Sequence, residues 1–79
     1  MQYTVDTDGR LVRFERADGL AAIKVLRAAG FKYGNGECGR GLYSPTWDRQ
    51  MGYWWGEQFL LNPSLLRHLP DAQAAGEAV

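Results

Sequence analysis

The first fifteen residues alternate between apolar and polar side chains around a single turn signal. Asp8-Gly9 is a typical type I′ dipeptide, so a two-residue loop at this point predicts a β-hairpin. In that register Val5 pairs with Val12, and the polar residues pair with one another on the opposite face. We therefore expect one wholly apolar face, formed by Tyr3, Val5, Val12 and Phe14.

A helix is predicted directly after this hairpin. Asp18 is a suitable N-cap, because its carboxylate can accept hydrogen bonds from the free N–H groups of the first turn. Gly30 suits the position after the last turn, where a left-handed residue closes a helix. We expect Lys24 and Arg27 on the outer side. The side that covers the hairpin follows helical spacing, through Ala22, Ile23, Val25, Leu26 and Ala29.

The middle of the chain predicts a second hairpin that carries most of the aromatic residues. Residues 31–33 are expected to form a short strand, and residues 34–41, with four glycines, a mobile loop. Residues 42–47 are predicted to be extended, although Pro45 favours an edge strand or a break. A turn then leads into a returning strand over residues 52–55.

A short C-terminal helix completes the predicted domain. Asn62 is a suitable N-cap, Pro63 fits the first helical position, and Pro70 ends the helix. The sequence thus predicts an α+β fold, with an N-terminal antiparallel β-hairpin packed on one amphipathic helix, a second aromatic-rich hairpin and a short C-terminal helix. Residues 1–70 would form a single compact domain and residues 71–79 a flexible tail, since the tail has no apolar period.

The composition is typical of one small domain in a reducing compartment. Of the 79 residues, 46% are hydrophobic and 13% aromatic, which is enough for one core. A single cysteine cannot form an internal disulfide, no signal peptide is visible, and no stretch approaches the ~20 apolar residues of a membrane span. We therefore expect a cytoplasmic protein of a host cell. A core of this size is also consistent with a homodimer.

The tryptophans and tyrosines provide the strongest functional signal. Neighbouring side chains of a strand face opposite ways, and so small a domain rarely covers large rings on both faces. Alternation favours Trp54 as the outward ring with Trp55 inward, and the reverse phase of the strand would exchange the two. The alternative is that these rings fill the core, as aromatic residues do in many small domains. The functional hypothesis is a protein-binding surface, formed by Tyr43, Trp47, Arg49, Trp54 and Arg40.

Binding of single-stranded nucleic acid is the second hypothesis. Nine basic residues balance nine acidic ones, so the net charge does not indicate a nucleic-acid-binding protein. Seven of the nine basic residues nevertheless lie within residues 10–40. Phosphate contacts would come from Arg13, Lys24, Arg27 and Lys32, while the tryptophans stack on bases.

No group of residues in the sequence predicts catalysis, a metal site or a cofactor. The glycine-rich segment lacks both the Gly-Lys-Ser/Thr ending and the following helix of a phosphate-binding loop. One cysteine and one histidine, Cys38 and His68, are too few ligands for structural zinc, and a catalytic pair of the two is the least favoured alternative. We expect a protein that is not an enzyme and that needs no cofactor.

In size and style, the whole chain resembles the small inhibitors of phages and mobile elements, above all the anti-CRISPR proteins. It is short, begins at Met1, carries no catalytic set, and is rich in Ala, Arg, Gly and Trp. The resemblance implies a protein-binding inhibitor that acts by steric occlusion. Its partner would be a type I Cascade complex, in which it blocks DNA recognition or nuclease recruitment. The neutral net charge argues against a DNA mimic, since such mimics are strongly acidic.

Overall fold

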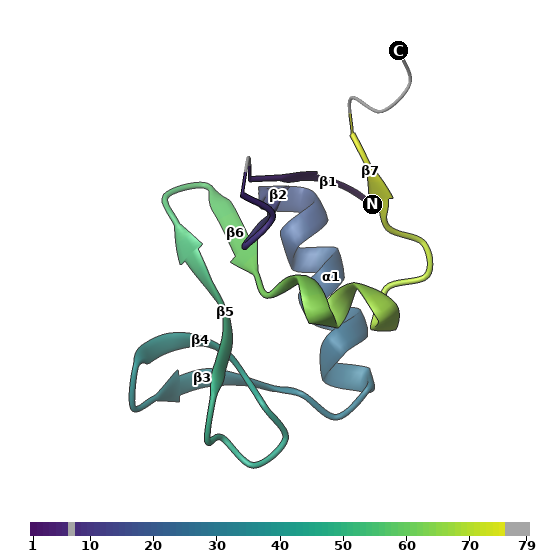
Figure 1. Ribbon diagram of the computed structural model, residues 1–79. Helices are drawn as coiled ribbons and strands as arrows, with labels where there is room; N and C mark the ends of the chain where they lie inside the picture. Colours follow the sequence, from purple (N-terminus) through teal and green to yellow (C-terminus); the bar gives the residue numbers. More distant parts are fainter. Residues whose placement is uncertain (7, 76–79) are drawn as a thin grey trace.

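One mixed β-sheet runs through the molecule, and a single α-helix packs against one of its faces (Figure 1). The computed structural model describes residues 1–6 and 8–75. Among these residues the sheet has seven strands in the order β3-β4-β5-β6-β2-β1-β7. The elements are, in chain order, β1 (Gln2–Val5), β2 (Val12–Glu15), α1 (Arg16–Ala28), β3 (Lys32–Gly36), β4 (Gly39–Tyr43), β5 (Gln50–Trp55), β6 (Gln58–Leu61), the 3₁₀ helix η1 (Pro63–His68) and β7 (Gln73–Ala74). The structure is thus broadly consistent with the predicted α+β class.

The N-terminal hairpin has the predicted register but a wider turn. Val5 lies opposite Val12, as predicted. Gly9 is left-handed, with φ +70°, and its N–H donates to the Asp6 carbonyl over 2.9 Å, so the turn is not the predicted two-residue loop. Thr7 lies outside the described residues. Val5 is 49% exposed, so the apolar face of the hairpin is not covered at this end.

The predicted C-terminus of the helix is confirmed, whereas its predicted N-cap is wrong. Helix α1 begins at Arg16, and Asp18 lies within its first turn, where a carboxylate favours the helix dipole. At the other end Gly30 has φ +109°. Its N–H donates to the Arg27 carbonyl, and the next N–H, of Phe31, donates to Leu26. This pair of bonds is a Schellman motif.

The buried side of α1 is rotated from the predicted one. Val25 is 37% exposed and Ala29 is exposed, while Gly19 is buried. A Cβ at Gly19 would lie 2.8 Å from the Cβ of Phe59. The helix therefore crosses the sheet at its glycine, which brings the turn around Gly19 closest to β6. The core between α1, η1 and the sheet contains Val12, Phe14, Ala22, Ile23, Leu26, Leu42, Phe59, Leu61, Leu65 and Leu69.

The glycine-rich segment is a tight β-hairpin rather than the predicted mobile loop. Strands β3 and β4 pair from Lys32–Tyr43 down to Gly36–Gly39. The ring of Tyr43 lies where a Cβ at Gly36 would be, and its hydroxyl donates to the Gly39 carbonyl over 2.6 Å. The same hydroxyl accepts from the N–H of Cys38 over 3.0 Å. The glycines thus make room for a buried tyrosine that closes the hairpin.

Strand β6 was not predicted, and it joins the two halves of the sheet. It pairs with β5 on one side and with β2 on the other, so the expected second hairpin is part of one continuous sheet (Figure 1). A two-residue turn, Gly56-Glu57, links β5 to β6. The extended segment predicted for residues 42–47 ends at Tyr43 instead, and a loop over residues 44–49 leads into β5.

The C-terminal part confirms the predicted cap and corrects the predicted tail. The Asn62 side chain accepts from the N–H of Ser64 over 3.0 Å, with Pro63 in the first turn, although the helix is of the 3₁₀ type. Residues 73–74, expected to be flexible, form β7 and pair with β1 in parallel. The rest of the predicted tail, residues 76–79, lies outside the described residues.

Candidate binding groove

A hydrogen-bonded loop between β4 and β5 presents Trp47 to solvent. The N–H of Trp47 donates to the Ser44 carbonyl, and the N–H of Ser44 donates to the Arg49 carbonyl, both over 2.9 Å. The carboxylate of Asp48 accepts hydrogen bonds from the hydroxyls of Ser44 and Thr46. These two bonds, that from Ser44 first, lower the pKa of Asp48 below its ordinary value. The loop is thus held by interactions that flank Trp47 on both sides.

Trp47 itself has an uncommon backbone conformation. Its φ of +65° makes it the only non-glycine residue with a positive φ among residues 1–6 and 8–75. A left-handed conformation costs a residue with a Cβ roughly 1–2 kcal/mol. Its ring packs 5.3 Å from that of Tyr43 between centroids, yet 41% of the residue stays exposed. Strain of this kind persists only where the surroundings impose it, and it is frequent at binding sites.

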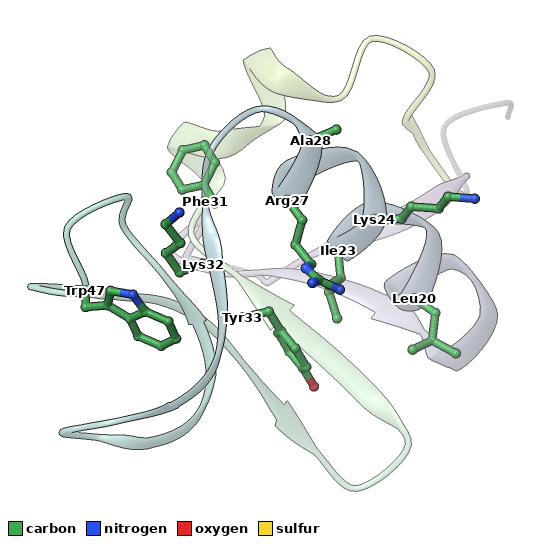
Figure 2. A pocket seen from close by; sticks show the side chains of 9 residues that line it. All are labelled: Leu20, Ile23, Lys24, Arg27, Ala28, Phe31, Lys32, Tyr33 and Trp47. Carbon is green, nitrogen blue, oxygen red and sulfur yellow. The ribbon is translucent and has the colours of Figure 1, made fainter.

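The exposed ring of Trp47 lies at the rim of an open hollow between α1 and β3, which we call the α1–β3 groove (Figure 2). The groove has a volume of about 880 Å³. Its apolar and aromatic lining consists of Leu20, Ile23, Ala28, Phe31, Tyr33 and Trp47, and its charged lining of Lys24, Arg27 and Lys32. No acidic residue of the described part of the chain lines it.

The positive charge of the groove is not neutralised within the described part of the chain. Lys24, Arg27 and Lys32 are exposed, and none of them lies within 4.0 Å of a carboxylate there. In Figure 2 the Arg27 side chain extends from α1 toward the ring of Tyr33, with Leu20 on one side and Trp47 on the other. The groove can therefore attract an anionic partner that also offers apolar groups.

Tyr33 is held in the groove by contacts with two other side chains. Its hydroxyl accepts from the indole N–H of Trp54 over 2.8 Å. The guanidinium of Arg40 lies over its ring, 5.6 Å from the centroid. These contacts come from β5 and β4, so the ring stays in place without any ligand.

The residues of the hypothesised protein-binding surface do not form one patch. Tyr43 is 1% exposed and bonded within the β3–β4 hairpin. Trp54 is half-buried and packs 5.1 Å from Phe59, on the core side. Arg40 lies on Tyr33, while Arg49 and Trp47 are exposed in the loop after β4. Trp47 is therefore the member of that set that reaches the groove.

The predicted orientation of the two neighbouring tryptophans is wrong. Trp54 faces the core side of the sheet, and Trp55 is 70% exposed. Alternation along β5 was recognised correctly, but the phase depends on β6, whose Phe59 pairs with Trp54 on the core side. Trp55, rather than Trp54, is thus the exposed ring of this pair.

Three of the four residues of the nucleic-acid hypothesis come together in the groove. Lys24, Arg27 and Lys32 all line it, from α1 and from the start of β3. The fourth, Arg13, lies elsewhere in the sheet, where its guanidinium donates to Asp6 over 2.7 Å and to Gln58 over 3.3 Å. The structure therefore combines Trp47 from the first hypothesis with three cations from the second.

The remaining candidate chemistry of the sequence lies in separate elements. Cys38 is exposed in the β3–β4 turn, whereas the ring of His68, in η1, packs edge-on to Phe31 at 5.3 Å. Among the described residues no three His, Cys, Asp or Glu side chains are close enough together to hold a metal ion. None of the helices described for this chain is long and apolar enough to cross a membrane.

No protein-family model matches this chain, and no curated protein or solved structure matches it either.

Proposed function

We propose that this protein is a small binding protein that inhibits its partner by steric occlusion, and that Trp47 and the α1–β3 groove are the centre of its contact surface. The observation that carries the proposal is the left-handed Trp47 on a hydrogen-bonded loop, with its ring exposed at the rim of the groove. Tryptophan and arginine are the residues most enriched at interface hot spots. A preorganised ring also binds with a smaller loss of conformational entropy.

The resemblance to anti-CRISPR proteins names the partner to test first, a type I Cascade complex. Occlusion there would block DNA recognition or nuclease recruitment. The neutral net charge and the basic groove support contact with a protein surface rather than imitation of DNA.

The test measures how strongly a purified type I effector complex binds its target DNA with and without this protein. We expect inhibition by the unchanged chain and its loss in Trp47→Ala. Trp55→Ala is the matched control, because it removes an exposed indole that does not line the groove. Inhibition that survives Trp47→Ala would contradict the assignment of the contact surface. If effector complexes from several hosts bind DNA equally well with the protein present, Cascade is not the partner.

Single-stranded nucleic acid binding is the second candidate function, favoured by three cations that form no ion pair with the described residues and lie beside an exposed indole. A mobility-shift assay with single- and double-stranded DNA and RNA tests it. Binding through several phosphates would weaken by orders of magnitude from low to moderate salt, whereas an apolar protein interface would change little. The absence of any shift at micromolar protein eliminates this function.

A homodimer remains part of the proposal, because a core of ten buried residues is small. Sedimentation equilibrium of the full chain tests it directly. A monomer at all concentrations would leave the contact surface on one chain, and inhibition would then follow a one-to-one stoichiometry.

A further inference from the structure

The α1–β3 groove lies at the edge of the sheet rather than above one of its faces. Tyr33 pairs with Leu42, whose side chain is in the core, so Tyr33 points to the α1 side. Its neighbours Lys32 and Gly34 belong to the opposite face, and the Trp47 ring lies over Gly34. Residues from both faces therefore line one hollow. Such a hollow occupies the position that one more strand would take beside β3.

Strand β3 offers the backbone groups that an added strand needs. It is the last strand of the sheet on that side and pairs only with β4 within the described residues. An edge strand presents a row of unpaired N–H and C=O groups, which is a template for pairing with another chain. The five residues from Lys32 to Gly36 are long enough for such pairing.

The charges around this edge specify the kind of strand that would fit. Lys32 flanks the edge on one face, Arg27 flanks it from α1, and Lys24 lines the groove farther along the helix. An added strand would direct alternate side chains to these two faces. Acidic side chains would meet the cations, and apolar ones would meet Leu20 and Trp47, which are 49% and 41% exposed.

We propose that the α1–β3 groove takes an extended acidic peptide segment of the partner, which adds as a strand to the free edge of β3. This deepens the proposed function and rests on it, since it specifies how a partner protein would be held. The hydrogen bonds to β3 would supply affinity, and the basic and apolar groups on the two faces would supply specificity.

The same groove is less suited to single-stranded nucleic acid. Such binding uses successive exposed rings on which bases stack. Here Tyr33 is covered by Arg40 and bonded to Trp54, which leaves Trp47 as the exposed ring of the lining. An open sheet edge does not contribute to base stacking, whereas it provides the backbone hydrogen bonds for an added strand.

The first experiment selects displayed random peptides of about eight residues on the immobilised full chain. We expect enriched peptides to carry Asp or Glu together with apolar residues, since both faces of the edge offer a cation and an apolar group. The best peptide is then synthesised with N-methyl groups on every second residue, in each of the two possible phases. One phase should bind as before and the other should lose binding, because only one edge of an added strand bonds to β3.

Charge reversal provides the matched variants. The double variant Arg27→Glu, Lys32→Glu should weaken peptide binding about tenfold or more, whereas Arg67→Glu, an exposed cation on η1, should leave it unchanged. Amide NMR shifts on peptide addition should be largest over residues 32–36.

Three results would overturn the inference: no peptide is enriched, both N-methyl phases bind equally, or an oligo-dT strand competes with every selected peptide and binds more tightly. The last result would favour nucleic acid as the occupant. The proposed function is judged separately by the effector-complex assay. Inhibition that depends on Trp47 but not on the β3 edge would retain the function and remove only this mode of contact.

Discussion

The indole N–H of Trp54 donates a hydrogen bond to the hydroxyl oxygen of Tyr33, with 2.8 Å between the two atoms. The bond joins β5 to β3 across the intervening strand β4. It explains why Trp54 is not free for a partner although the sequence predicts it to point outward. It also holds a ring of the groove at a fixed position.

Removing this bond should destabilise the fold modestly. Tyr33→Phe leaves a half-buried indole N–H without its partner, and we expect a loss of about 1 kcal/mol in the free energy of unfolding. Urea denaturation measures it. In a double-mutant cycle with Trp54→Phe, the double variant should lose less stability than the sum of the losses of the two single variants.

The matched control is Tyr53→Phe, which removes a hydroxyl that makes no hydrogen bond within the described residues. It should change the stability little. Equal effects of the two tyrosine substitutions, or full additivity in the cycle, would show that the Trp54–Tyr33 bond contributes nothing.

Gly19 should be intolerant of even one methyl group. Replacing a glycine with alanine inside a helix normally stabilises it by about 1 kcal/mol. Here the new Cβ would lie 2.8 Å from the Cβ of Phe59 and 3.2 Å from the Trp54 ring. We expect Gly19→Ala to destabilise the protein by about 1–3 kcal/mol in urea denaturation, because α1 must move away from the sheet.

An exposed position on the same helix provides the comparison. Ala21→Gly should cost about 1 kcal/mol through helix propensity alone. If Gly19→Ala were instead stabilising, the close approach of α1 to β6 would not exist in solution.

The signals that predicted structure correctly are local ones. Gly30 ends a helix and Asn62 caps one because each acts on backbone groups a few residues away. Strand β6 escaped prediction because Phe59, Leu60 and Leu61 are all buried, so the strand shows no alternation. The Gly56-Glu57 dipeptide before it is a recognisable hairpin signal, with glycine at the first turn position.

The candidate site shows the same division. Trp47 is recognisable from its residue type, and Lys24 and Arg27 from their place opposite the apolar side of a helix. The sequence does not show that these three residues line one groove, since that depends on where β3 lies relative to α1. The glycines of residues 34–41 predict a loop, because their packing role appears only once Tyr43 is placed against Gly36.

The loop that carries Trp47 should respond to acid. Hydrogen bonds from Ser44 and Thr46 lower the pKa of Asp48, so the unfolded chain binds this proton more tightly than the folded one. The stabilisation that these bonds give the folded state is complete above the ordinary pKa of the carboxyl, about 4. It is lost as the pH falls through the lowered pKa of Asp48. NMR titration of the Asp48 carboxyl and the Trp47 indole N–H should show both transitions together.

Asp48→Asn should shift the Trp47 indole signal at neutral pH, because the charged acceptor is gone. Asp71→Asn, which changes an exposed carboxylate that makes no side-chain hydrogen bond in the described chain, should leave that signal in place. A Trp47 signal that ignores both acid and Asp48→Asn would separate the indole from this hydrogen-bond network.

The left-handed backbone of Trp47 predicts an unusual order of stability. Both Trp47→Ala and Trp47→Gly lose the packing of the ring on Tyr43, but only glycine adopts φ +65° without strain. We therefore expect the Trp47→Gly variant to be more stable than Trp47→Ala, with a free energy of unfolding about 1 kcal/mol larger. Urea denaturation of the two variants decides, and the reverse order would indicate an unstrained residue 47.

The three tryptophans should differ in what their removal changes. Trp54→Ala creates a cavity against Phe59 and breaks the bond to Tyr33, so we expect a loss of about 3 kcal/mol or more in stability. Trp47→Ala should weaken partner binding while the fold persists, because its ring lies at the groove rim. Trp55→Ala should change neither property strongly, although Trp55 is the most exposed of the three.

Acrylamide quenching of single-tryptophan variants provides the structural check: Trp55 should be quenched most and Trp54 least. A Trp54→Ala variant that keeps its stability but loses its partner would support an outward orientation of Trp54 and would place the contact surface on β5.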